Sequence, residues 1–344
     1  MTQEEFIGWD AVTRRGVFAE VAAQKGVADE VVEKDFWVTF VLGRLFGDTT
    51  LRELLRFKGG TSLSKGYSLI DRFSEDIDLV VEWSRIPGDL GGLDVQETIK
   101  EGKSPKELQK ELAVSVPKYL KDSLVPEIDR CLDGVLTARF DNQDALGDAG
   151  VVWIDYPATC ENDSYLSPHI KLELGVLGAH CPNEDKGIKS LVSEYVNEIE
   201  SPGAQVVMVT ALETFWEKIS ILHQEHHRQP DHPYKEGATN RISRHYYDVY
   251  QILGKYGFEE VLRQAKLLEQ AKWYTETFHR RKWASLSTAR KGSLALSPSD
   301  YALANLKDDY AAMKDLIWGE YPAFDQILSR IEEFENAYNR DDMC

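Results

Sequence analysis

The chain has 344 residues, of which 42% are hydrophobic and 28% are charged. This composition is typical of a soluble globular protein and excludes a disordered chain. No apolar run approaches the roughly 20 residues that cross a bilayer, and the acidic start lacks the regions of a signal peptide. The net charge of −18 argues against a broad, nonspecific nucleic-acid binder but permits a local basic patch. We therefore expect a cytoplasmic protein without membrane or DNA partners, its four scattered cysteines free thiols.

The first half of the chain mixes helical and strand patterns. Residues 4–47 read as helices, and the segment that starts EKDFW (33–46) has apolar residues at the spacing of one helical face. A helix is expected after a turn at Gly59-Gly60, and residues 76–83 read as a strand. Residues 84–104 read as a loop and residues 105–132 as helical. Three further strands are predicted at residues 134–140, 151–156 and 169–176.

The second half is predicted to be helical. A short helix is expected near residues 188–195, and from Val206 onward the pattern is helical, with helices at 211–225, 244–255 and 258–271 and further helices within 299–337. We draw the domain boundary near Gly203. The prediction is an α+β protein: a first domain over residues 1–204, made of N-terminal helices and a mixed sheet, and a helical domain over residues 205–344.

The segment KGGTSLSKGYSLIDRFSEDIDLVV, residues 58–81, carries the first candidate site. Gly59 and Gly60 allow the backbone to approach a ligand closely. The helix start that follows offers unpaired N–H groups to a phosphate, and Thr61 and Ser62 can add hydroxyl donors. The alternative is an ordinary helix entry turn. The pattern is neither a P-loop nor a GxGxxG dinucleotide turn.

Two carboxylates end the same segment. Asp76 and Asp78 are two residues apart on a predicted strand, so both side chains point to one face. Such a pair can bind Mg²⁺, which takes one or two carboxylates together with substrate phosphates, and can serve a two-metal site. The alternative is a solvated acidic strand face.

Taken together, a glycine turn, a helix and a strand-borne DxD resemble the polymerase-β-like nucleotidyltransferase superfamily. The resemblance implies that residues 1–204 form the nucleotidyltransferase domain and that the helical domain over residues 205–344 closes the nucleotide cleft. The sequence of residues 58–81 resembles the AbiEii/AbiGii toxin family more closely still, since members of that family carry KGGT, a helix and then RFSEDIDL. EKDFW, HIKLELG (169–175), ALETFWEKISILH (211–223) and RHYYDVYQIL (244–253) resemble that family in the expected order. The resemblance is weaker over residues 84–165 and after residue 255.

The resemblance implies roles for particular residues. Asp76, Asp78 and Glu173 would hold Mg²⁺ or Mn²⁺, and Glu173, on one strand face with Lys171, would help to deprotonate the attacking hydroxyl; the alternative is a surface glutamate paired with a neighbour. The expected nucleotide-binding residues are Lys58, Gly59, Gly60, Thr61, Ser62, Lys65 and Arg244.

Lys218 and Asp248 complete the expected catalytic set. Lys218 has no acidic residue three or four positions away, so an ion pair within its own helix is not available. The resemblance favours binding of the triphosphate, with Asp248 orienting Lys218 through an ion pair. The alternative for Asp248, as for Glu213, is an exposed charge on a helix.

Two further patterns invite a function. His223 and His227 have the i, i+4 spacing of a helical metal pair, but HExxH is absent and we do not favour zinc. The run His279–Trp283, with Arg290 and Lys291, is the densest basic patch of the chain and lies near tryptophans. Basic and aromatic groups suit RNA; the alternative is a solvated helix face.

The resemblance implies a metal-dependent nucleotidyltransferase toxin of a toxin–antitoxin or phage-abortive system. It would transfer NMP from an NTP to an acceptor hydroxyl, with the tRNA 3′ end as the leading acceptor and a cognate antitoxin as a possible partner. One alternative is a GTP- or ATP-binding toxin or regulator that acts without transfer. Another is a nucleotidyltransferase that modifies a protein side chain.

Overall fold

The computed structural model describes residues 1–82, 95–141, 150–160, 167–175, 182–200, 203, 205–234, 240–278 and 281–340. The chain forms two compact units: unit 1 is Met1–Tyr67 with Phe73–Thr210, and unit 2 is Ser68–Arg72 with Ala211–Cys344. The predicted domain boundary thus differs from this division in two respects. The segment after Gly203 still belongs to the sheet, and a five-residue piece of the first half, Ser68–Arg72, belongs to unit 2.

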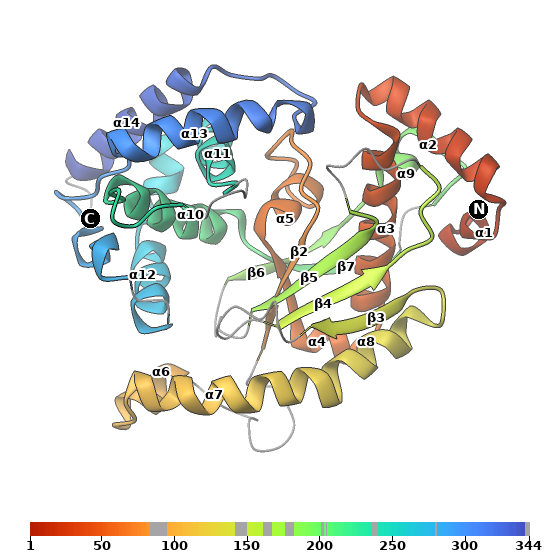
Figure 1. Ribbon diagram of the computed structural model, residues 1–344, viewed down its shortest axis with the longest axis horizontal. Coiled ribbons are helices and arrows are strands. Elements are labelled where there is room, and N and C mark those ends of the chain that lie inside the picture. Colours follow the sequence, from red (N-terminus) through yellow and green to blue (C-terminus); the bar gives the residue numbers. More distant parts are fainter. Residues whose placement is uncertain are drawn as a thin grey trace. The chain divides into compact units, whose positions relative to one another are not determined.

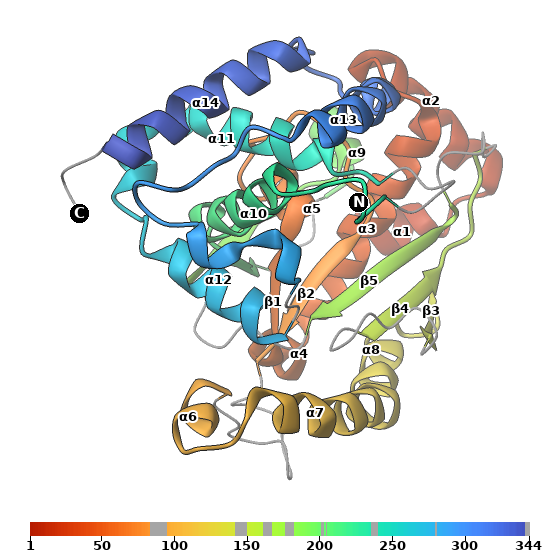
Figure 2. The ribbon, with the colours of Figure 1, turned by 60° about the vertical axis from the view of Figure 1, so that its left-hand side comes forward.

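Unit 1 contains one mixed sheet of seven strands in the order β3-β4-β5-β2-β1-β7-β6 (Figures 1 and 2). β1 runs parallel to β7 and β2 parallel to β5, and the other neighbours are antiparallel. The strands are β1 Leu55–Lys58, β2 Ile77–Val81, β3 Thr137–Asp141, β4 Gly150–Asp155, β5 His169–Gly175, β6 Asn183–Gly187 and β7 Gln205–Val209.

The helices of unit 1 precede, connect and cover these strands. They are α1 Gln3–Ile7, α2 Ala11–Lys25, α3 Asp29–Gly47, α4 Thr49–Leu54, α5 Gly59–Lys65, α6 Val95–Lys100, α7 Pro105–Tyr119, α8 Val125–Leu132 and α9 Leu191–Tyr195, with a π-helical turn at Leu120–Leu124 between α7 and α8.

α3 packs against β5 and β7 and forms the centre of the unit 1 core. β5 shows why this face is apolar: Ile170, Leu172 and Leu174 are fully buried, and the residues between them are half-buried. This alternation places the polar residues of β5 on the opposite face. Phe36 and Trp37 of α3 extend the apolar side with an edge-to-face ring contact.

Unit 2 is helical. Its helices are α10 Ala211–His226, α11 Ser243–Leu262, α12 Leu267–Phe278, α13 Asp300–Ala312 and α14 Phe324–Arg340, and short 3₁₀ turns lie at Lys282–Ala284, Leu286–Thr288 and Lys314–Leu316. α14 packs on α11, and Phe334 contacts the rings of Phe215 and Trp216 from α10. α11 is interrupted at Gly257, whose φ is 74°, at the predicted break between two helices.

Two element predictions are wrong. Residues 206–209 form a strand, β7, rather than the start of the helical region. They are β-branched or apolar and are all buried, so both faces of β7 are covered and the sequence shows no alternation. Residues 95–100 form helix α6, where a loop was expected. Residues 84–94 of that loop, and residues 142–149 between the strands predicted at 134–140 and 151–156, lie outside the described residues.

Within the described residues, no helix combines the length and apolar character needed to cross a membrane. Cys131 and Cys160 are free thiols. Cys181 and Cys344 lie outside the described residues.

Candidate functional site

Register in the centre of the sheet brings three of the predicted residues into one row. Lys58 of β1 is paired with Asp78 of β2, and Asp78 is paired with Glu173 of β5. Residues paired across adjacent strands point to the same face, and adjacent strands lie roughly 4.8 Å apart. All three residues are half-buried, on the face opposite the apolar side of β5. Asp76 comes directly before β2, two residues from Asp78.

Gly59 lies directly against Asp78. Its φ is 78°, in the left-handed region that side chains disfavour. A Cβ atom at this position would lie 1.8 Å from Asp78 Oδ2 and 2.6 Å from its Cγ. The glycine is therefore required both by the turn and by the close approach of the Asp78 carboxylate to the backbone.

The hydroxyl groups of Thr61 and Ser62 hold the backbone. Thr61 Oγ1 donates to the carbonyl oxygens of Asp76, at 2.5 Å, and of Ser74, at 3.2 Å, and Ser62 Oγ donates to Gly59 O at 2.9 Å. Thr61 and Ser62 are at most 1% exposed. Both hydroxyls thus donate to main-chain carbonyls in this structure, and their contact with phosphate stays a prediction. Gly60, also buried, follows Gly59 at the start of α5.

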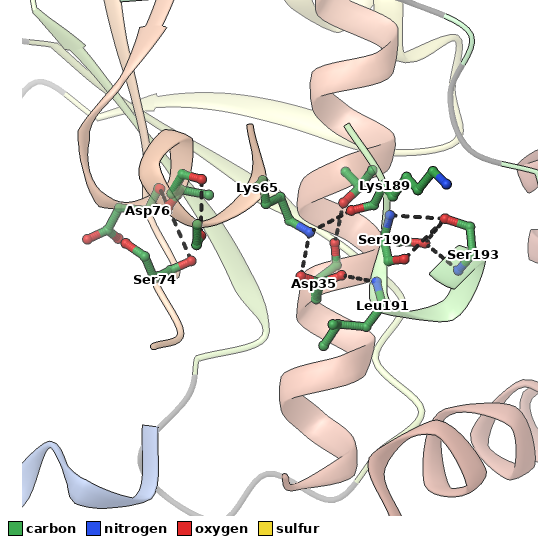
Figure 3. A network of polar contacts seen from close by, with 11 residues as sticks. Asp35, Lys65, Ser74, Asp76, Lys189, Ser190, Leu191 and Ser193 are labelled. Carbon is green, nitrogen blue, oxygen red and sulfur yellow. Dashed lines mark hydrogen bonds and ion pairs between the residues drawn. The ribbon is translucent and has the colours of Figure 1, made fainter. Parts of the chain in front are cut away.

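Lys65 also differs from expectation. Its ammonium group pairs with Asp35 Oδ1 of α3 at 2.5 Å and donates to Lys189 O at 3.1 Å (Figure 3). The two side chains are 8% and 7% exposed. Lys65 thus ties the end of α5 to α3 in this structure, and its contact with the nucleotide stays a prediction.

Glu173 bonds to a neighbour on its own strand. Lys171 Nζ lies 2.6 Å from Glu173 Oε1, so the surface-pair alternative describes this conformation. Among the described residues, no group of three or more histidine, cysteine, aspartate or glutamate side chains is arranged to hold a metal ion. The expected triad of Asp76, Asp78 and Glu173 is therefore not assembled. The aspartate pair alone still fits Mg²⁺ or Mn²⁺, because such ions use one or two carboxylates and complete their shell with phosphate and water.

In unit 2, Asp248 pairs with two cations. Arg72 Nε and Nη2 donate to its two carboxylate oxygens at 2.7 and 2.8 Å, and Lys218 Nζ lies 2.9 Å from Oδ2. The side chains of Arg72, Lys218 and Asp248 are 3%, 6% and 0% exposed. Lys218 also lies 3.3 Å from His245 Nδ1. The predicted ion pair between Lys218 and Asp248 is therefore present.

The electrostatics of this cluster follow from burial and an excess of positive charge. Burial would raise the pKa of Asp248, but the charges and hydrogen bonds of Arg72 and Lys218 outweigh it and hold that pKa well below its usual range. Burial lowers the pKa of Lys218, and Asp248 opposes this shift. Burial and the nearby Lys218 hold the pKa of His245 well below its usual range. The cluster thus holds two cationic groups against one carboxylate.

Arg72 is the participant that the sequence did not single out. It lies in the RFSED stretch, four residues before Asp76, and its partner is 176 residues away. The only signal was its place inside a motif whose other members were assigned. Arg244, predicted to bind nucleotide, is half-buried on α11, one turn before Asp248.

The histidines of α10 hold neighbouring segments. His223 is fully buried, and its ring nitrogens bond to Ala295 O at 3.1 Å and to Thr288 Oγ1 at 3.0 Å. His226 Nδ1 bonds to Ser297 O at 2.6 Å. The ring of His227 contacts both other histidine rings. These contacts leave the zinc hypothesis without support among the described residues.

The basic segment, residues 281–291 in the described part of the chain, packs on unit 2 through its apolar residues. Arg281, Lys282, Arg290 and Lys291 are exposed, whereas Ala284, Leu286 and Ala289 between them are buried. The Trp283 ring contacts His232 and the Arg228 guanidinium, so it packs within unit 2. His279 and Arg280 lie outside the described residues.

Comparison with known proteins gives the class of the molecule. A family model described as nucleotidyl transferase AbiEii toxin, type IV toxin–antitoxin system, matches residues 41–337, most of the chain. The protein is a nucleotidyltransferase. More particularly, it belongs to the AbiEii toxin family of type IV toxin–antitoxin systems, which implies an NTP substrate and an antitoxin partner.

Among solved structures, the chain is similar to MenT4, a nucleotidyltransferase toxin from Mycobacterium tuberculosis H37Rv. The identity is 16% and the TM-score 0.44, over 94% of this chain and 99% of that one. Comparison with curated proteins gave no match.

Proposed function

We propose that the protein is a metal-dependent toxin that transfers NMP from an NTP to a hydroxyl of an RNA acceptor, with the tRNA 3′ end as the leading candidate. The observation that carries this proposal is the row of Lys58, Asp78 and Glu173, with Gly59 held against Asp78. We place the reaction in the cytoplasm, where NTPs and tRNA are available.

Asp76 and Asp78 would hold Mg²⁺ or Mn²⁺ together with the substrate phosphates. The metal would supply charge neutralisation and alignment for in-line attack. The oxygen of the acceptor hydroxyl attacks the α-phosphorus, the bond from that phosphorus to the bridging oxygen breaks, and pyrophosphate leaves. Glu173 is our candidate for the group that accepts the hydroxyl proton, which requires it to release Lys171.

The remaining roles concern the triphosphate. Lys58 and the Gly59-Gly60 backbone lie beside the carboxylates on unit 1, where they are suited to contact the nucleotide. Lys218 and Arg244 of unit 2 are proposed phosphate ligands, because the buried cluster has more positive than negative charge. Asp248 would hold Lys218 in the orientation that phosphate binding needs.

The basic segment is the candidate surface for the RNA acceptor. Residues 277–299 contain no aspartate or glutamate in a chain whose net charge is −18. Arg281, Lys282, Arg290 and Lys291 are exposed and make no ion pair with any residue that the structure describes. Such a surface attracts a phosphate backbone at low salt. The packing of Trp283 makes the expected contacts electrostatic rather than stacking.

The proposal is tested by incubating the protein with each labelled NTP, Mg²⁺ and total tRNA. Label at the 3′ end of tRNA is the expected result. Label on cellular protein would favour the protein-modifying alternative. Tight GTP or ATP binding by calorimetry, with no label on any RNA or protein, would favour a toxin that acts by binding.

A further inference from the structure

Three consecutive charged residues are buried in the N-terminal half of α3. Glu33, Lys34 and Asp35 are 2%, 2% and 5% exposed. Charged side chains are rarely buried this deeply without partners, because removing them from water carries a large desolvation cost. Successive residues of an α-helix point about 100° apart, so the three charges reach three different parts of unit 1.

Lys34 holds the segment that leads into the carboxylate pair. Its ammonium group lies 2.8 Å from Glu75 Oε2 and donates to Ser167 O at 3.0 Å. Glu75 immediately precedes Asp76. The carbonyl groups on either side of it, those of Ser74 and Asp76, both accept the Thr61 hydroxyl.

Asp35 holds the other end of the same motif. Its carboxylate pairs with Lys65, the last residue of α5, and accepts the backbone N–H of Leu191 at 2.7 Å (Figure 3). The contacts therefore form a closed circuit. It runs from α3 through Glu75 to the backbone at Asp76, across Thr61 into α5, and through Lys65 back to α3.

We propose that Lys34 and Asp35 are positioning residues that fix the segment before β2 against the Gly-Gly turn, and thereby hold Asp76 and Asp78 in the arrangement that binds the metal–nucleotide complex. This inference rests on the proposed function. Burial alone does not require such a circuit, since an apolar residue at either position would fill the core of α3. The specific partners, one beside each half of the motif, point to positioning.

Glu33 provides a matched control on the same helix. Its carboxylate accepts hydrogen bonds from Thr159 N, Thr159 Oγ1 and Cys160 N at 2.7–2.9 Å. It is as deeply buried as Lys34, but it holds the connection between β4 and β5 instead of the Gly-Gly and DxD motif. Removing it tests the effect of breaking a buried charge network in α3 without touching the circuit.

The decisive experiment compares Lys34→Met, Glu75→Gln and the double variant with Glu33→Gln, using Asp76→Ala as the reference. Each variant is assayed for thermal unfolding, for Mn²⁺ binding by calorimetry, and for label transfer at a temperature where it is folded. Replacing both partners removes the unpaired buried charge, so the double variant should recover much of the stability that Lys34→Met loses.

We expect the double variant to bind Mn²⁺ about 10-fold more weakly, as loss of groups that orient metal ligands does, and to transfer label about 100-fold more slowly. Glu33→Gln should unfold at a lower temperature, with Mn²⁺ affinity and transfer unchanged. Wild-type Mn²⁺ affinity and transfer in the double variant, or equal losses in Glu33→Gln, would overturn the positioning role. If the double variant does not fold, Asp35→Asn is measured in the same way.

The reference variant separates this inference from the proposed function. If Asp76→Ala abolishes Mn²⁺ binding and transfer while the double variant keeps both, only the positioning role fails. If Asp76→Ala behaves like the wild type, the assignment of the carboxylate pair fails, and the positioning role fails with it.

Discussion

At the scale of single residues, Gly59 links the backbone conformation of the turn to the position of a candidate site residue, Asp78. Its left-handed φ is typical of a tight turn, and the space that a Cβ would occupy is filled by the Asp78 carboxylate. A side chain here must therefore displace a proposed metal ligand, whereas at most left-handed glycines it would only strain the backbone.

The substitution Gly59→Ala should abolish measurable label transfer, because Asp78 must move away from the new Cβ. Gly26→Ala is the matched control: its φ is 76°, and no atom lies within 4 Å of the Cβ position. Both variants should lose about 1 kcal/mol of unfolding free energy through left-handed strain, but Gly26→Ala should keep its activity. Equal transfer rates in the two variants would contradict the close approach to Asp78.

His223 should make the stability of unit 2 dependent on pH. Burial, with a smaller effect from His227, lowers the pKa of His223 from 6.5 to about 4. Above pH 6.5 the His223 side chain is neutral in both the folded and the unfolded chain. Between pH 6.5 and 4 the unfolded chain takes up a proton that the folded chain does not, so stability falls as pH falls, by up to about 3 kcal/mol.

Denaturant unfolding at several pH values checks this dependence. His223→Gln should flatten the slope between pH 6.5 and 4, and His226→Gln, which alters a half-buried neighbour, should leave it in place. A slope that is unchanged in His223→Gln would show that other groups cause the pH dependence.

The sequence predicted part of the candidate site for identifiable physical reasons. The pairing of Lys218 with Asp248 was implied by the family resemblance, whereas the residues alone showed only that Lys218 has no acidic neighbour three or four positions away on its own helix. The ion pair of Lys65 with Asp35 was not predicted, because Asp35 lies in a separate helix that is distant in sequence. Arg72 was missed for the same reason, since its partner is distant in sequence. Buried ion pairs between distant segments leave no local pattern.

At the scale of elements, the segment Ser68–Arg72 is part of unit 2 although it connects α5 to β2 of unit 1. Its Arg72 forms a bidentate pair with Asp248, and the backbone at Asp71 accepts a hydrogen bond from Trp318 N at 3.0 Å. The connection between the glycine turn and the carboxylate pair is thus anchored in the helical unit.

Asp248→Asn should destabilise unit 2 by about 3–5 kcal/mol, because it leaves Arg72 and Lys218 buried beside a neutral group. Asp309→Asn is a suitable comparison. Asp309 accepts the backbone N–H groups of Arg241 and Ser243 on separate carboxylate oxygens, so asparagine keeps one acceptor and loses the other, and it leaves no cation of the buried cluster unpaired. Chemical denaturation of both variants checks the difference. A loss of unfolding free energy below about 1 kcal/mol for Asp248→Asn would contradict the proposed contribution of the cluster to stability.

The basic segment gives a prediction on RNA binding. Neutralising Arg281, Lys282, Arg290 and Lys291 to glutamine should weaken tRNA binding and reduce the slope of log affinity against log salt by up to about 3. NTP binding should be unchanged. The control neutralises four exposed lysines elsewhere on unit 2: Lys255, Lys266, Lys307 and Lys314. An equal effect of both sets would show only nonspecific attraction.

The element predictions succeeded where periodicity was strong. The strand over residues 169–176 and the helix over 211–225 appear as β5 and α10, because each has a clear alternating or helical face. β1 and β6 were not predicted. β1 is four residues long, and β6 reads Asn-Glu-Asp-Lys-Gly, a polar sequence without alternation. Only pairing with β7 makes β6 a strand, and pairing of this kind is not visible in one segment.

At the scale of the whole molecule, the charge distribution is compatible with the proposed RNA acceptor. The net charge of −18 disfavours general nucleic-acid binding, so an acceptor must be attracted by a local surface. The negative surface elsewhere also suits a basic partner, a property that the antitoxin can be tested for.

The central claim is that Asp76 and Asp78 support transfer of a nucleotidyl group. The most direct test compares NTPs that carry the isotopic label on different phosphates. The protein is incubated with tRNA, Mg²⁺ and an NTP labelled at either the α- or the γ-phosphate. We predict label on tRNA from the α-labelled NTP alone, with pyrophosphate released, and none with Asp76→Ala. Transfer of the γ-label, or α-label transfer by Asp76→Ala at the wild-type rate, would contradict the account.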